Sequence, residues 1–191
     1  SYTGSGDPVT PKNPADLAKR KAERNKRDLV AMAMAARASK LHSDDNFLVM
    51  PDQEIFNGPL GGHTDLLFSH PVLWDERMPG QPFKETTASG PVYHVGGADD
   101  LMQMARDENI LISMPHPRSK GSTGFPDAIK DKAYFADPQY MGFGARWGMG
   151  IDGSEKRLCE YRCWPLLDDI SNWMSEKNAP LKRCLLYTSP S

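Results

Sequence analysis

A histidine at position 116 stands between two prolines, where the apolar stretch "ILISM" (110–114) gives way to the basic loop "RSKGS" (118–122). Proline restricts the backbone on both sides, and a stiff backbone keeps an imidazole aimed at a metal ion. The sites of α/β sheets and barrels gather at the ends of buried strands, which is where this residue lies. We therefore interpret His116 as a candidate metal ligand. Taken alone, a capped or core histidine explains the residue equally well.

Two more residues that can bind a metal ion border predicted strands. Glu54 ends "FLVMPDQE" (47–54), and His63 follows the glycine-containing turn "GPLGG" (58–62). A carboxylate together with neutral imidazoles is the donor set of zinc, manganese and iron sites, and a mixed set favours a catalytic site over a closed structural one. The prediction requires that Glu54, His63 and His116 converge at one edge of the sheet.

Other histidines are weaker candidates. His70 lies at the far end of the strand that begins at His63, and seven residues of strand span about 23 Å. Both cannot bind one ion if that strand is straight, so we interpret His70 as a structural residue or part of a pocket rim. His94 alternates with apolar neighbours and is interpreted as a core residue. Asp152 is a weak candidate for a further carboxylate.

The order "FLVMPDQE", "GGHTDLLF", a helix and then "ILISMPHP" resembles the PHP superfamily, the polymerase and histidinol phosphatase type metallohydrolases, and most closely their carbamate-hydrolase-like branch. The resemblance covers about residues 46–120. It implies that Glu54, His63 and His116 are ligands of divalent metal ions (zinc, manganese or iron). It also implies an α/β fold, here a partial, distorted TIM-like (β/α) barrel with metals at the strand ends.

The sequence departs from the family pattern. The family begins with a His-x-His motif and an Asp-His pair and closes with an Asp-x-His, and none of these occurs here. We attribute their absence to truncation at both ends, with a degenerate site as the alternative. The chain as written is therefore expected to be incomplete, and inactive or only poorly active on model phosphoesters.

The predicted function is metal-dependent hydrolysis of a phosphoester, carbamate or related ester through a metal-activated water. The substrate is expected to be a small anion, with Arg118, Lys120 and Arg146 as its contacts, because guanidinium and ammonium groups bind phosphate and carboxylate. Pairing of these residues with nearby carboxylates is the competing interpretation. The alternative function is a noncatalytic binding or scaffold domain.

Length and composition indicate the class of protein and its domain division. The chain has 191 residues, a formal net charge of −2 and 39% hydrophobic residues, which suits one globular domain. We expect a polar leader at 1–12, a single domain at 13–183 and a tail at 184–191, "CLLYTSPS", that resembles a translated sequencing adapter and packs against nothing. No long apolar run or signal peptide is evident, so a soluble, cytoplasmic protein without a membrane partner is expected.

Most of the elements have clear signals. A long helix is predicted at 13–40, with eight Lys or Arg against three Asp or Glu, and only its apolar half, "LVAMAMAARA" (29–38), should be deeply packed. Its basic half is interpreted as a solvated face, because the net negative charge argues against nucleic-acid binding. The remaining predictions are strands at 46–50, 63–70 and 110–114, a long loop at 71–91, a helix at 98–109, a strand or hairpin at 140–152, and a last helix within 159–177 packed through Leu166, Ile170, Trp173 and Met174.

Overall fold

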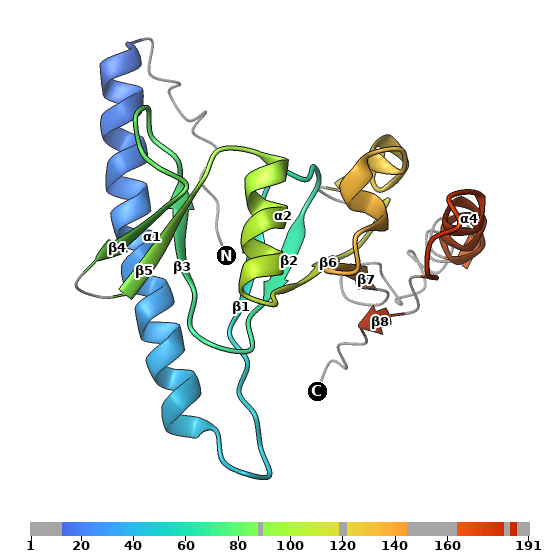
Figure 1. The fold of residues 1–191 in the computed structure, drawn as a ribbon, viewed down its shortest axis with the longest axis horizontal. Coiled ribbons are helices and arrows are strands. Elements are labelled where there is room, and N and C mark those ends of the chain that lie inside the picture. Colours follow the sequence, from blue (N-terminus) through green and yellow to red (C-terminus); the bar gives the residue numbers. More distant parts are fainter. Residues whose placement is uncertain (1–12, 88–89, 119–121, 145–163, 182–183, 187–191) are drawn as a thin grey trace, which may run out of the picture.

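The computed structural model describes residues 13–87, 90–118, 122–144, 164–181 and 184–186. Within these ranges the chain is a mixed α/β fold with a five-stranded sheet, ordered β1-β2-β6-β7-β8, and a three-stranded sheet, ordered β3-β5-β4 (Figure 1). The predicted α/β class is confirmed. The described strands form two open sheets and no closed barrel, so the barrel part of the prediction is not seen.

Helix α1 spans Pro14–His42, close to the predicted bounds. Its N-cap is Asn13, whose side-chain oxygen accepts a hydrogen bond from the backbone N–H of Ala15 at 3.0 Å. A proline in the first turn suits this position, because its missing N–H would have no helical partner there. Cap and proline together explain why the helix begins here.

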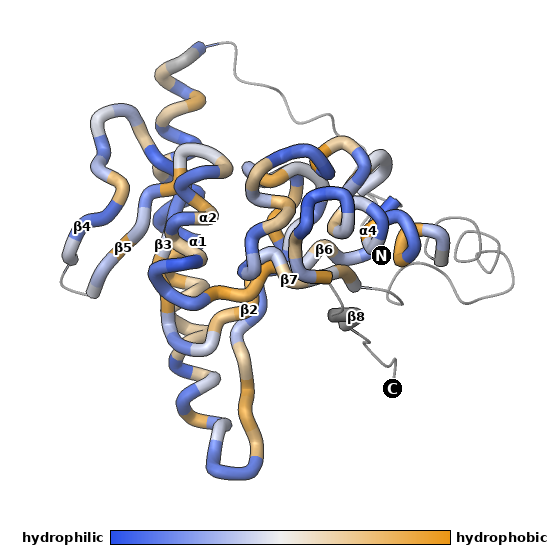
Figure 2. Tube along the Cα trace, turned by 45° about the vertical axis from the view of Figure 1, so that its right-hand side comes forward, coloured by the Kyte–Doolittle hydropathy of each residue, from blue (hydrophilic) through white to orange (hydrophobic). Residues whose placement is uncertain are grey.

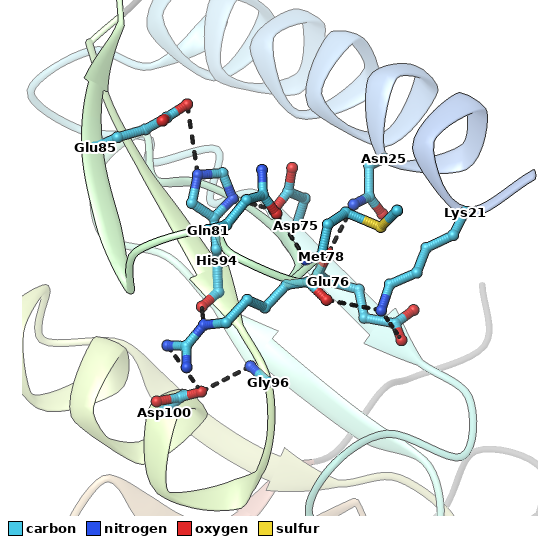
Figure 3. A network of polar contacts seen from close by, with 11 residues as sticks. Lys21, Asn25, Asp75, Glu76, Met78, Gln81, Glu85, His94, Gly96 and Asp100 are labelled. Carbon is cyan, nitrogen blue, oxygen red and sulfur yellow. Dashed lines mark hydrogen bonds and ion pairs between the residues drawn. The ribbon is translucent and has the colours of Figure 1, made fainter. Parts of the chain in front are cut away.

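The prediction that the apolar half of α1 is deeply packed is wrong. Val30, Met34 and Leu41 are 55%, 68% and 67% exposed, and this end of α1 runs beyond the strands (Figure 1). The polar half attaches the helix instead: Asn25 is buried and its Nδ2 donates to the Glu76 carbonyl at 2.7 Å (Figure 3). Polar side-chain contacts with β3, from Asn25 to the Glu76 carbonyl and from Lys21 to the Glu76 carboxylate, therefore attach α1, with Met32 as a partly buried apolar contact.

The predicted strand at 46–50 is also wrong, since β1 begins later, at Asp52, and ends at Ile55. Asp44 Oδ1 accepts from the backbone N–H groups of Asn46 and Phe47, and Ser43 Oγ accepts from that of Val49. These local side-chain bonds occupy the donors that a sheet would use. Phe47 is accordingly 64% exposed, and the apolar run lies in the loop that follows α1 (Figure 2).

The expected loop at 71–91 contains most of the three-stranded sheet instead. Strands β3 (Leu73–Glu76) and β5 (Gly90–Val95) pair in parallel, and β4 (Lys84–Thr87) pairs antiparallel with β5. Pro79 and Pro82 fall in the connection between β3 and β4. The prolines therefore separate short strands, and each strand is too short to show a period of its own.

A buried histidine joins two strands of this sheet. His94 on β5 is 2% exposed, as its interpretation as a core residue requires, and its Nδ1 lies 2.5 Å from Asp75 Oδ1 on β3 (Figure 3). On the other side of the ring, Glu85 Oε1 of β4 lies 3.5 Å from Nε2. The imidazole thus sits between carboxylates of both neighbouring strands.

The five-stranded sheet forms the core with α2. Helix α2 (Ala98–Asp107) buries the predicted face, and β6 (Leu111–Met114) follows it as predicted. Strand β2 (Thr64–Leu67) lies between β1 and β6, β7 (Tyr140–Gly144) pairs in parallel with β6, and two 3₁₀ helices, η2 (Asp127–Ile129) and η3 (Ala133–Ala136), precede β7. The central buried side chains are Leu66, Leu101, Met104, Ile112, Met114, Phe135 and Phe143.

The C-terminal region is described in part. Helix α4 (Trp164–Glu176) buries Leu166, Ile170 and Met174, and Trp173 packs partly buried against the core, as predicted. Residues 145–163, which include Asp152 and much of the predicted hairpin, lie outside the described residues. Cys184–Leu186 form β8, paired in parallel with β7, so the expectation that this tail packs against nothing is wrong for these residues.

None of the described helices combines the length and apolar composition needed to cross a membrane.

The contact between Asp75 and His94 gives a first prediction. Replacing Asp75 with alanine leaves a buried imidazole nitrogen without its partner, so the free energy of unfolding should fall by about 2 kcal/mol. Chemical denaturation measures this change. Asp131→Ala is the control, because that carboxylate pairs with Lys130 and Lys177 at the surface, and its midpoint should equal that of the wild type. Equal midpoints for the two variants would contradict the stabilising role of the buried pair.

Candidate metal centre

Antiparallel pairing brings the three predicted ligands to one edge of the five-stranded sheet. Glu54 on β1 pairs with Asp65 on β2, and Asp65 pairs with Ser113 on β6. Because β2 runs opposite to both neighbours, the end of β1, the start of β2 and the end of β6 meet. Glu54, His63 and His116 therefore approach from three strands, and one ligand atom from each lies within 4.8 Å of the other two.

The side chains are already in mutual contact. His63 Nδ1 lies 2.9 Å from Glu54 Oε1, and His116 Nε2 lies 3.4 Å from the same oxygen. The two imidazole rings meet edge to face, with centroids 4.9 Å apart. Donors bound at 2.0–2.2 Å to one tetrahedral ion lie about 3.4 Å from one another. A set that converges this closely fits a divalent cation with small side-chain adjustments.

The segment from Ser122 to Asp127 supports the backbone beside both histidines. Ser122 is fully buried, and its Oγ accepts a hydrogen bond from the backbone N–H of His63 at 3.0 Å. The Phe125 carbonyl accepts from the backbone N–H of Arg118, just after His116, at 2.7 Å. One short segment thus fixes the chain at two ligands that are far apart in sequence. The sequence analysis assigned no role to Ser122 or Phe125.

The turn before His63 requires glycine. Gly61 has a φ of +84°, and a Cβ added there would lie 2.4 Å from Cε1 of Phe125. The Phe125 ring therefore packs directly on the turn that leads into the ligand. Both the backbone conformation and the close aromatic contact exclude a larger residue.

Asp65 is a further acidic residue beside the candidate ligands. It is the cross-strand partner of Glu54, and Ser113 Oγ donates to its Oδ2 at 3.4 Å. Burial, together with the charges of Asp52 and Glu54, raises the pKa of Asp65 to about 7. The carboxylates therefore create a negative potential that a cation would relieve. The spacing in "HTD" was an available signal, because residues two apart on a strand face the same side.

An open cavity of about 640 Å³ reaches the candidate site. Glu54 and Phe56 line it from β1 and the turn beyond, and Arg24 and Asn25 line it from α1. Phe56 is 64% exposed, and its ring meets that of His63 edge to face, 4.7 Å between centroids. A solute in this cavity would therefore reach a candidate ligand beside an exposed aromatic ring.

The three predicted substrate contacts have different outcomes. Arg118 forms ion pairs with Asp127 and Asp169 at 2.7 and 2.6 Å, and hydrogen bonding to Asp127 is the main cause that raises the pKa of its guanidinium. A substrate anion would compete with both carboxylates. Lys120 and Arg146 lie outside the described residues.

His70 is not part of the cluster. Its Nε2 lies 2.9 Å from Glu108 Oε2, and its side chain is 46% exposed. It follows β2 at the end opposite to His63, in agreement with its interpretation as a structural or rim residue.

Comparison with protein-family models found no match, and comparisons with curated proteins and with solved structures found none either. The resemblance to the PHP superfamily therefore rests on the quoted motifs alone.

The glycine turn gives a second prediction. Gly61→Ala should lower the free energy of unfolding by about 1 kcal/mol through its backbone conformation, plus about 1–3 kcal/mol through the clash with Phe125. Gly80→Ala is a matched control, because Gly80 has a φ of +82° and nothing within 4 Å of its added Cβ. Thermal and chemical unfolding of both variants measure the difference. If both substitutions lower the free energy of unfolding by the same amount, the contact with Phe125 does not constrain the turn.

A third prediction concerns pH. Folding raises the pKa of Asp65 from 3.8 to about 7, so the folded protein holds a proton that the unfolded chain releases. This contribution to stability is fully present below about pH 4 and is lost as the pH rises to about 7. In metal-free buffer, the unfolding midpoint of Asp65→Asn should fall less steeply with pH over this range than that of the wild type. Asp45→Asn, in an exposed loop, should keep the wild-type slope. Identical slopes for wild type and Asp65→Asn would contradict the assignment.

Proposed function

We propose that this chain is a metal-dependent hydrolase of the PHP type, acting on a phosphoester or on a carbamate or related ester. The observation that carries the proposal is the convergence of Glu54, His63 and His116 within 4.8 Å. When bound, a divalent zinc, manganese or iron ion supplies Lewis acidity, which lowers the pKa of a coordinated water and stabilises negative charge on a substrate oxygen.

The chain's own residues have separate roles in this proposal. Glu54 offers a charged oxygen, and His63 and His116 offer neutral nitrogens, which is the donor set of zinc hydrolases with an open coordination position. His116 is 3% exposed, so one wall of the centre is dry, whereas Glu54 borders the open cavity. Substrate is therefore expected to enter from the Glu54 side, past Phe56.

The fold that accompanies this function is a distorted PHP-type barrel, of which the five-stranded sheet would be one part. The gathering of all three ligands at one strand edge supports this proposal, because barrel enzymes place their sites in that way. The antiparallel pairing of β1, β2 and β6 differs from the parallel order of a regular (β/α) barrel, so any such barrel would be distorted at the metal centre.

A noncatalytic cation-binding or scaffold domain is the second candidate. The observation that favours it is the contact of Glu54 Oε1 with both imidazoles, at 2.9 and 3.4 Å, which satisfies the three side chains without any ion. The sequence also lacks the other ligand motifs of the resembled family. Such a domain would bind a cation through these residues without turnover.

Metal binding and hydrolysis, measured on the same protein, test the proposal. Isothermal titration with zinc or manganese should give one site per chain, and Glu54→Gln should weaken binding by more than about 100-fold, the upper range for losing a group that only supports a ligand. His70→Ala is the matched control and should bind like the wild type. Release of 4-nitrophenol from phosphate, carbamate and acetate esters should be slow, manganese- or zinc-stimulated and abolished by Glu54→Gln.

The outcomes separate the candidates. Metal-dependent turnover that requires Glu54 supports the hydrolase. Binding without turnover of any of the three esters supports the noncatalytic domain. A wild-type chain that binds neither metal rejects the metal centre.

A further inference from the structure

Arg118 lies two residues after the candidate ligand His116 and makes a two-sided contact within the fold. Its Nε and Nη2 donate to the two carboxylate oxygens of Asp127 at 2.8 and 2.7 Å. Nη2 also donates to Asp169 on α4 at 2.6 Å. The Arg118 side chain is 17% exposed, so these pairs are partly shielded from water. A bidentate guanidinium fixes both the distance and the orientation of its partner.

The backbone at His116 and at Arg118 adopts an uncommon conformation. His116 has a φ of 34° and Arg118 a φ of 59°, and residues other than glycine rarely adopt positive values. Such a conformation persists only where the surroundings hold it. The hydrogen bond from the Arg118 N–H to the Phe125 carbonyl holds the main chain, and the fork to Asp127 holds the side chain.

We propose that Arg118 is a positioning residue that holds His116 in its ligand orientation and connects α4 to the metal centre. The inference rests on the proposed metal centre and assigns Arg118 a role different from substrate contact. Asp127 is the near arm of this connection and Asp169 the far arm. Asp169 lies on α4, and the core packing of Leu166, Ile170 and Met174 on the same helix fixes its position.

Coupling of this kind acts in both directions. If the Arg118–Asp169 contact strengthens metal binding, metal binding must strengthen the contact by the same factor. The amides of α4 should therefore exchange with solvent more slowly in the metal-bound protein, although α4 carries none of the three ligands.

Zinc affinity tests the near arm. Arg118→Lys keeps the positive charge but loses the fork, and Asp127→Asn removes the acceptor charge. Each should raise the zinc dissociation constant by about 10–100-fold, as for other groups that orient a metal ligand. The double variant should lose less than the product of the single losses, because both remove one interaction. Arg106→Lys is the control, since it alters an ion pair between the last turn of α2 and Asp137, which includes none of the three candidate ligands.

Hydrogen exchange tests the far arm without any use of activity. Zinc should slow amide exchange in Trp164–Glu176 of the wild type, and Asp169→Asn should remove this difference. Asp169 is 40% exposed, so its replacement should preserve the fold even if Arg118→Lys does not. Control amides in β5 should show no zinc effect in either protein.

The results decide between three cases. Raised dissociation constants together with a zinc effect on α4 that needs Asp169 support the positioning role. Variants that fold and bind zinc like the wild type overturn it. A variant whose metal-free form unfolds at a lower temperature but whose zinc affinity is unchanged also overturns it, because the ion pair is then purely structural. A wild-type chain that binds no zinc overturns the inference together with the metal centre, and is recognised by the wild-type titration alone.

Discussion

The antiparallel register of β1, β2 and β6 is the constraint on which the candidate centre depends. Glu54, Asp65 and Ser113 lie across from one another in this register, and His63 and His116 extend from the adjoining strand ends. A shift of one residue in β1 would turn Glu54 to the opposite face of the sheet. The core resists such a shift, because Ile55, which alternates with Glu54 along β1, is partly buried against the core cluster on that other face. Apolar packing on one side of the sheet thus specifies the polar arrangement on the other.

The face of the sheet that carries Asp52, Glu54 and Asp65 creates an unfavourable electrostatic energy in the metal-free protein. Burial raises the pKa of Asp52 as well as that of Asp65, and in both cases the charge of Glu54 adds to the effect. Apolar or neutral side chains at these positions would fold at a lower electrostatic cost. A cation placed beside these carboxylates would offset their repulsion, so the metal-free form is the one that bears the full electrostatic cost.

Local signals predicted much of the fold and the three side chains that converge at the candidate metal centre. The cap at Asn13, the period of α2 and the glycines and prolines beside the ligands each act over a few residues and can be read directly. The failed predictions for residues 71–91 and for the packing of α1 have nonlocal causes: β3 and β5 are adjacent in the sheet although β4 lies between them in sequence, and α1 attaches through Asn25 to a carbonyl 51 residues away. Arg118 meets Asp169 across the same separation, and no local pattern in either segment indicates that partner.

Strand β1 has a second property that follows from its place at the border of the sheet. Among the described strands it pairs only with β2, so its outer edge presents main-chain groups that another chain could extend. Asp52 and Glu54 put negative charge beside this edge, and two such edges repel each other. A cation bound at Glu54 would remove part of that repulsion. In the proposed metal-bound form this edge would therefore repel a second copy less, and concentrated protein with zinc or manganese bound should self-associate more readily than the metal-free form.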